Sequence, residues 1–183
     1  MKDNNTKTRK KIKNNSASQS YMIKQKPECE CYSLDKEKMT KYATAMYQNV
    51  CIGMQSINDL LPSVKNQNLY DELKQEYNEF KKTQERLMEE AHIQQIELKD
   101  NNFFKKSRLW LSIKFSTLFN KDVRHVAEMM TIGTIMGLND VYKAHADNKC
   151  VNKQLDNIAD ELEKLMEKNY SNLKTFIKVQ KNN

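Results

Sequence analysis

The stretch LYDELKQEYNEFKKTQERLMEE, residues 69–90, repeatedly places a large apolar side chain three or four positions after the last one. This spacing is the period of an α-helix with one apolar face. Charged residues fill the other faces, often as opposite charges four positions apart. The pattern predicts an amphipathic helix over residues 68–95, with its apolar face turned toward a core. The predicted inward residues are Leu69, Leu73, Tyr77, Phe80, Leu87 and Ala91.

Three further segments show the same helical period, and the whole chain has only three glycines and two prolines to make turns. The sequence predicts helices over residues 35–61, 122–146 and 152–179, the first ended by Pro62 and the second opened by Asp122 as N-cap. Short connections join the first helix to the second and the third to the fourth. Short connections make neighbours antiparallel, so the sequence predicts an all-α, antiparallel four-helix bundle.

Residues 96–121 form a long crossover between the two predicted hairpins. This segment is rich in large apolar side chains, and a shorter helix from Phe103 to Phe119 is expected within it. The bundle domain is predicted to span residues 35–180. Residues 1–34 precede it as a tail and connector.

The positive charge of the chain is concentrated in this tail. Residues 1–26 hold eight Lys or Arg and one Asp, which accounts for the whole net charge of +7. They carry little apolar surface to offset the entropy of ordering, so a disordered basic tail is expected. Its basic block, Thr6 to Lys13, could bind the phosphates of a nucleic acid. No aromatic residue interleaves the block to stack on bases, and a solubilising tail is the favoured interpretation.

Several classes of protein are not indicated. The longest uncharged run, residues 42–58, contains Thr, Gln, Asn and Ser, and no apolar stretch follows Met1, so no membrane span and a cytoplasmic location are expected. Lys and Asn are abundant and Arg is scarce, which is typical of an AT-rich bacterial genome. No Gly-rich phosphate loop, serine nucleophile elbow or His-Glu-x-x-His motif occurs, so no catalytic residue and no cofactor is predicted.

The four cysteines are expected to be reduced thiols in such a compartment. Cys51 and Cys150 are interpreted as isolated thiols. Cys29 and Cys31 form a Cys-x-Cys pair, which could instead bind a soft metal or respond to redox state, although the second pair of a zinc ribbon is missing.

The first and third predicted helices differ from the other two. Residues 42–58 and 129–139 carry no charge and contain all three glycines, Gly53, Gly133 and Gly137. A glycine inside a helix costs roughly 1 kcal/mol relative to alanine, so a local gain is expected. Close packing of these two helices within one chain, with Gly53 facing the others, is the first interpretation. An interface between two copies is the second, because faces without charge are typical of interfaces, and a ligand slot is the third.

A second stripe lies on the third predicted helix. It comprises His125, Met129, Ile132 and Met136, and Met54 of the first helix could lie near it. Such residues could offer soft ligands to Cu(I). Methionines that fill irregular gaps in a core are the favoured interpretation.

The hairpin LYDELKQEYNEFKKTQERLMEE, the crossover ending FSTLFNKD and the helix RHVAEMMTIGTIMGLNDVYKA resemble uncharacterised bacterial ferritin-like four-helix-bundle domains of unknown function. The resemblance implies a ferritin-like bundle with a long helical crossover between helices two and three. Metal-binding ferritin-like proteins use inward Glu residues and Glu-x-x-His pairs. The matching residues here are Glu89 with His92, and the reversed pair His125 and Glu128. The first predicted helix lacks an interior Glu and the fourth lacks His, so a complete di-iron site is not expected.

These patterns favour a non-catalytic helical-bundle protein with a structural or protein-interaction role. Its expected partner is a second copy, bound through the first and third predicted helices, or another protein. The alternative is a ferritin-like metal-binding or redox protein, whose metal ion would be held by His125, Glu128, Glu89 and His92.

Overall fold

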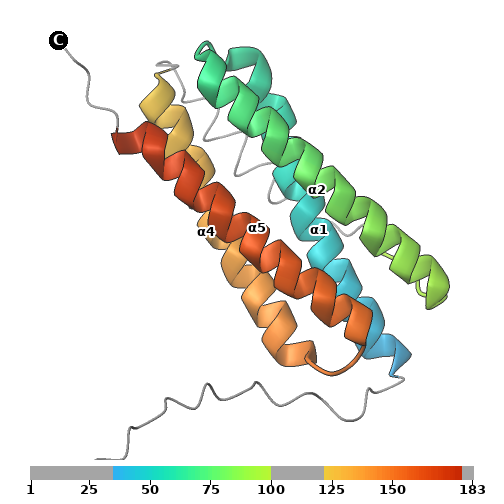
Figure 1. Cartoon of the computed structure of the whole chain (residues 1–183). Coiled ribbons are helices and arrows are strands. Elements are labelled where there is room, and N and C mark those ends of the chain that lie inside the picture. The colour runs from blue at the N-terminus through green and yellow to red at the C-terminus, as the bar shows by residue number, and fades with distance from the viewer. Residues whose placement is uncertain (1–34, 100–121, 179–183) are drawn as a thin grey trace, which may run out of the picture.

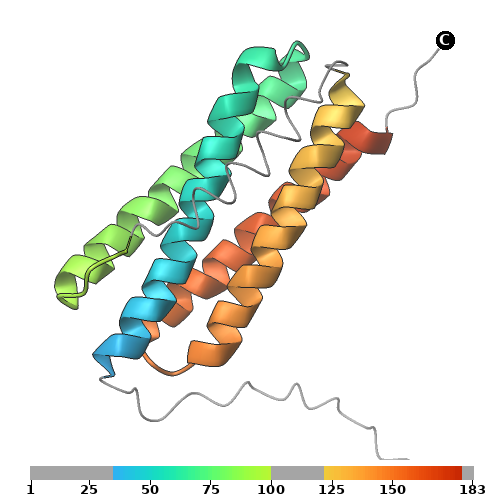
Figure 2. The same cartoon turned by 180° about the vertical axis from the view of Figure 1, so that it is seen from behind.

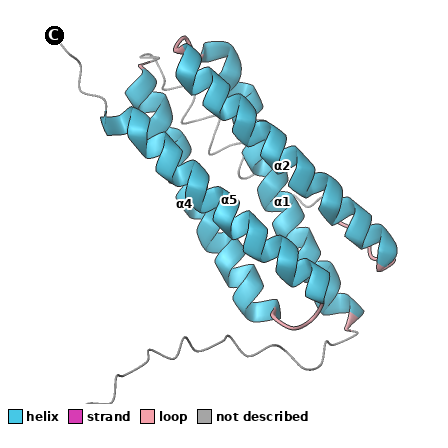
Figure 3. Ribbon diagram, in the orientation of Figure 1, coloured by secondary structure: helices cyan, strands magenta, loops and turns pink. Residues whose placement is uncertain are grey.

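The computed structural model of the chain describes residues 35–99 and 122–178, and within these two ranges all regular secondary structure is helical (Figure 1 and Figure 3). The prediction of an all-α chain with four long helices is confirmed. The predicted tail and connector at residues 1–34 and the predicted crossover helix at residues 103–119 lie outside the described residues. The helices are α1 (Lys36–Leu60), a short 3-10 helix η1 (Leu61–Ser63), α2 (Gln67–Ile93), α4 (Val123–Asn148) and α5 (Lys153–Lys178).

Polar side chains at the helix starts explain where the helices begin. The carboxylate of Asp35 accepts a hydrogen bond from the backbone N–H of Lys38 at 3.0 Å, and Asn66 accepts one from Leu69 at 2.9 Å. These bonds satisfy backbone donors that the first turn of a helix leaves without a partner. Asp122 precedes α4 as the sequence predicts, but its side chain makes no capping hydrogen bond.

The four helices form a ring of antiparallel neighbours. α1 packs on α2 and α4, and α5 packs on α4 and α2. Figure 1 and the reverse view in Figure 2 show α1 and α5 running in one direction and α2 and α4 in the other. Two hairpins therefore lie side by side, and α2 and α4 are diagonal to each other. Because α2 and α4 run in the same direction, the end of α2 and the start of α4 lie at opposite ends of the bundle.

The core lies along the axis of this ring. Leu69, Leu73 and Leu87 of α2 are fully buried, as the apolar spacing predicts. On α5 the inward position belongs to Met166, which is 3% exposed, whereas the neighbouring Leu165 is only partly buried. Buried polar residues also line the interior, and the apolar pattern gave no sign of them. They are Thr44, Ser56, Glu76, Glu90, Thr131, Thr134, His145 and Asn169.

Among the described residues, none of the helices combines the length and the apolar character that crossing a bilayer requires.

Candidate functional site

The four predicted metal ligands are not brought together. His125 and Glu128 lie near the start of α4, and both are exposed or half-exposed, with Nδ1 of the histidine 3.9 Å from Oε2 of the glutamate. Glu128 also accepts a hydrogen bond from Arg124 Nε at 2.9 Å. Glu89 and His92 are exposed in the last turns of α2, at the other end of the bundle (Figure 1). These side chains form two separate surface pairs.

The three glycines occupy three different environments. A Cβ added at Gly53 would lie 2.9 Å from the ring of Phe80, so this glycine lets α2 approach α1. A Cβ at Gly137 would lie 2.8 Å from Met166 Cε of α5 and 3.0 Å from Asn49 Oδ1 of α1. Gly53 therefore lies on the side of α1 that contacts α2, and it does not face the glycines of α4.

Gly133 differs from the other two. No described atom lies within 4 Å of the Cβ position that it lacks. Within this set only Gly137 lies where α1 and α4 come together, and there Asn49 Nδ2 donates a hydrogen bond to its carbonyl oxygen at 2.9 Å. Packing inside the bundle thus accounts for Gly53 and Gly137 and leaves Gly133 without an explanation.

The outer face of α4 exposes large apolar side chains beside Gly133. Ile132 is 51% exposed, Ile135 48% and Met136 52%. The interpretation of Met136 as a methionine that fills a gap in the core is therefore wrong, because α4 turns the opposite side, with Met130 and Thr134, toward the interior. We call Ile132, Gly133, Ile135 and Met136 the α4 face.

The two described cysteines differ from each other. Cys51 Sγ accepts a hydrogen bond from Gln84 Nε2 at 3.0 Å, between α1 and α2. Cys150 is disulfide-bonded, so its interpretation as an isolated thiol is wrong. Its partner lies outside the described residues.

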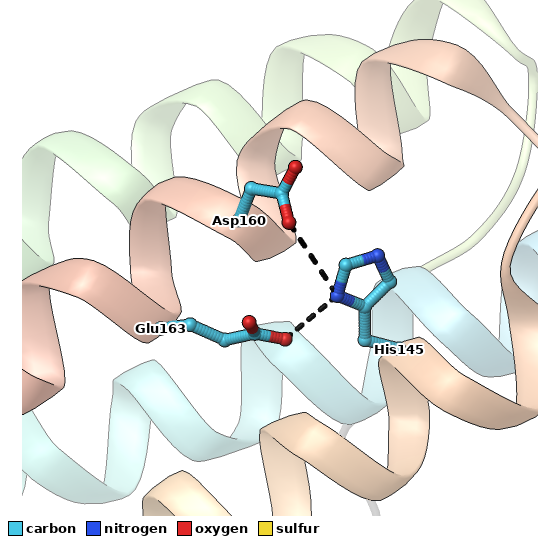
Figure 4. A group of neighbouring side chains, drawn as sticks. All are labelled: His145, Asp160 and Glu163. Atoms are coloured by element: carbon cyan, nitrogen blue, oxygen red, sulfur yellow. Dashed lines mark hydrogen bonds and ion pairs between the residues drawn. The ribbon is translucent and has the colours of Figure 1, made fainter. Parts of the chain in front are cut away.

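A cluster of one histidine and two carboxylates lies between α4 and α5 (Figure 4). His145 is only 6% exposed, and its Nδ1 lies 2.6 Å from Oε1 of Glu163 and 3.9 Å from Oδ1 of Asp160. The two acids are three positions apart on α5, which puts them on one face of that helix. Glu163 is largely buried and the Asp160 side chain is 44% exposed, so the cluster opens to water on the aspartate side.

Tyr42 of α1 forms the inner wall of this cluster. Its ring stacks on that of His145 with centroids 6.2 Å apart, and its hydroxyl donates a hydrogen bond to Asp156 Oδ1 at 3.3 Å. Burial raises the pKa of the Tyr42 hydroxyl well above its usual range, and the negative charges of Asp156, Glu163 and Asp160 raise the pKa further. Three carboxylates of α5 therefore create a negative potential around the imidazole of His145.

A second buried acid lies in the α2–α5 half of the core. Burial raises the pKa of Glu76 to about 8, and the neighbouring charge of Glu72 adds to this effect. Asn169 of α5 is the side chain that opposes the shift. A carboxyl with such a pKa is mostly protonated at neutral pH, so Glu76 is a structural acid held in its neutral form.

The sequence contained a signal for the His145 cluster. Asp156, Asp160 and Glu163 recur at four and three positions, which predicts an acidic stripe on one side of the last helix. His145 lies in phase with the inward residues Thr134 and Val141 of α4. A Glu-x-x-His pattern does not detect this cluster, because here the acids and the histidine come from different helices.

The comparisons with known proteins give no identification: no family model, no curated protein and no solved structure matches this chain.

Proposed function

We propose that this chain is a non-catalytic helical-bundle protein that acts by binding a protein surface, and that it forms a homodimer through the α4 face. The observation that carries the proposal is the exposure of about half of each of Ile132, Ile135 and Met136. They lie within residues 129–139, which contain no charged side chain. Removing such a surface from water favours association, and the lack of charge means that no ion loses its hydration.

Two features favour a second copy as the occupant. A face without charge is best matched by another face without charge, and the α4 face of a second copy of the chain meets this condition. Twofold symmetry is also the commonest way in which identical chains pair. Gly133 supports the same arrangement, because a missing side chain at the centre of the face allows the backbone of a partner helix to come close. The expected interface is therefore α4 against α4 of the partner.

The order of the helices supports a ferritin-like bundle as the fold of this protein. Ferritin-like bundles join two antiparallel hairpins by one long crossover. Here α2 and α4 run in the same direction, so the chain between them must connect opposite ends of the bundle. A bacterial source and a cytoplasmic location stay predictions from composition, and nucleic-acid binding by the basic tail stays a prediction as well. The structure gives no support to one metal site built from His125, Glu128, Glu89 and His92, because the two pairs lie at opposite ends of the bundle.

The dimer is tested by sedimentation velocity of the full chain over the micromolar range. Wild-type protein is expected to sediment as a dimer, and Met136→Lys as a monomer, because a lysine in the middle of an apolar interface loses its hydration without gaining a partner. Met88→Lys on α2 is the matched control: Met88 is also 52% exposed, and this substitution is expected to leave the dimer intact.

Gly133→Leu sharpens the same test. The open space around Gly133 lets the leucine fit within one chain, so the circular-dichroism spectrum keeps its helix content while the dimer is lost. A wild-type monomer at all of these concentrations would remove the proposal. Equal effects of Met136→Lys and Met88→Lys would also remove it, because the interface would then not lie on α4.

A further inference from the structure

We propose that His145, Asp160 and Glu163 form a binding site for a divalent transition-metal ion, such as Zn²⁺, between α4 and α5. The three side chains offer one imidazole nitrogen and two carboxylate oxygens, and these ligand atoms all lie within 4.8 Å of one another. This site is distinct from the pairs at His125 and at His92 that the sequence suggested. It also does not depend on the proposed dimer.

The distances suit a metal ion after a small movement of the side chains. Bonds from zinc to nitrogen or oxygen are about 2.0–2.2 Å long, so ligand atoms on a tetrahedron lie about 3.4 Å apart. His145 Nδ1 is 2.6 Å from Glu163 and 3.9 Å from Asp160, one distance below this value and one above it. Rotation of the two acidic side chains would place a cation between all three atoms without any movement of the helices.

The type of ligand selects the class of metal. Imidazole nitrogen suits Zn²⁺, Fe²⁺, Ni²⁺ and Cu²⁺ better than Ca²⁺ or Mg²⁺, which prefer oxygen alone. The two carboxylates of Asp160 and Glu163 balance the charge of a divalent cation. Three protein ligands leave a fourth position to water, on the side where Asp160 is exposed.

The surroundings of the site support this assignment. Stacking on Tyr42 holds the imidazole of His145 in place, and Tyr42 is itself hydrogen-bonded to Asp156, whose other oxygen accepts from the backbone N–H of Cys150 at 3.0 Å. A ligand that is fixed before binding loses less entropy when the metal arrives. Asp156 adds a third negative charge next to the site, and this charge attracts a cation.

The experiment uses full-length protein that has been stripped with a chelator and dialysed against Zn²⁺. We expect one Zn²⁺ to bind per chain. Its dissociation constant should rise at least tenfold in Asp160→Asn and in Glu163→Gln, because each variant removes one ligand. Asp160→Asn is the safer variant, since its side chain is 44% exposed and its loss leaves the core intact. Glu167→Gln is the matched control one turn along α5, where Glu167 accepts a hydrogen bond from Tyr142 at 2.5 Å.

Nuclear magnetic resonance of the imidazole rings identifies the ligand directly, because the chain contains only three histidines. Zn²⁺ is expected to shift the ring signals of His145 and to leave those of His92 and His125 in place. If zinc binds without shifting the His145 signals, or binds Asp160→Asn as tightly as wild type, the metal lies elsewhere, on the cysteines for example. That result, or the absence of any bound zinc, would overturn the proposal.

Discussion

The α2–α5 side of the bundle and the α1–α4 side are held together by different chemistry. Along the α2–α5 seam, Arg86 pairs with Glu161, and Lys168 lies 2.9 Å from Glu79. Asn172 donates a hydrogen bond to Glu72 at 2.6 Å on the same seam. Where α1 meets α4, the contact between Asn49 and Gly137 joins an amide to a backbone carbonyl. Ion pairs thus line the exposed seam between α2 and α5, whereas the α4 face has no charged side chain that could form one.

The interior follows the same division. The α2–α5 half buries the protonated carboxyl of Glu76 together with Asn169, beneath its charged surface. On the α1–α4 side, polar side chains such as Ser56 and Thr134 return hydrogen bonds to the backbone of their own helix. The α2–α5 half therefore holds the buried carboxyl whose pKa is raised to about 8, while Tyr42 and His145 are buried titratable side chains of the α1–α4 side.

The largest expected effect is the pH dependence that Glu76 gives to folding. Its pKa is about 8 in the folded chain against 4.5 as the reference value, so the folded state binds an extra proton between these two values. The contribution of Glu76 to the free energy of unfolding should therefore be largest below about pH 4.5, decrease as the pH rises toward 8 and then level off. The contribution of this one group is roughly 3–5 kcal/mol, measured by urea unfolding across the pH range.

Glu76→Gln separates this group from all the others, because glutamine resembles the protonated acid. The variant should lose the decrease between pH 5 and pH 8 and should be more stable than wild type at the upper end of this range. Parallel curves for the two proteins would show that Glu76 does not hold a proton in the folded chain.

A smaller effect is expected from Gly53→Ala, which adds a methyl group 2.9 Å from the ring of Phe80. Phe80 is 2% exposed, so other side chains surround the ring that has to move. Overpacking of this kind typically costs 1–3 kcal/mol, against roughly 1 kcal/mol gained from helix propensity. The free energy of unfolding should decrease by up to about 2 kcal/mol in chemical denaturation.

Gly133→Ala is the matched control, with open space where Gly53 has a ring. Measured in the Met136→Lys background, which is expected to be monomeric, it should increase the free energy of unfolding by up to about 1 kcal/mol, since only the helix propensity changes. Effects of the same sign at both positions would contradict the assignment of Gly53 to the α1–α2 contact.

The smallest effect is expected at the surface pair of Arg86 and Glu161. Their side chains are 43% and 57% exposed, so water and salt weaken the attraction. A double-mutant cycle with Arg86→Ala and Glu161→Ala should give a coupling energy of roughly 0.2–1 kcal/mol, decreasing as salt is added. A coupling energy above this range would mean that the α2–α5 seam depends on its charges for stability.

Apolar spacing predicted the helices well, because it reports on burial over many residues. The predicted ranges for α1 and α5 agree with the structure to within two residues at each end. Spacing alone did not show that Met136 is exposed, since Met136 shares a helical period with Ile132 just as the buried Met130 does with Thr134. With few charges on this helix, the sequence contained little to tell its two sides apart.

The candidate site was harder to predict than the fold. His145 and Glu163 meet only because α4 and α5 pack at one particular register, and a linear pattern holds no information about register between helices. The glycines show the same limit: the sequence predicts close contacts at Gly53, Gly133 and Gly137 together, but in the structure Gly53 meets Phe80, Gly137 meets Met166, and Gly133 has open space.

The hydrogen bond from Asn49 to the carbonyl of Gly137 has a consequence for how the two hairpins fit together. A buried Asn can specify the register of two packed helices more sharply than apolar side chains do, because its amide needs one particular partner. The amide of Asn49 needs a carbonyl that no side chain hides, and the bare backbone at Gly137 provides one. Together with the polar pairs along the α2–α5 seam, this contact fixes the position of one hairpin along the other.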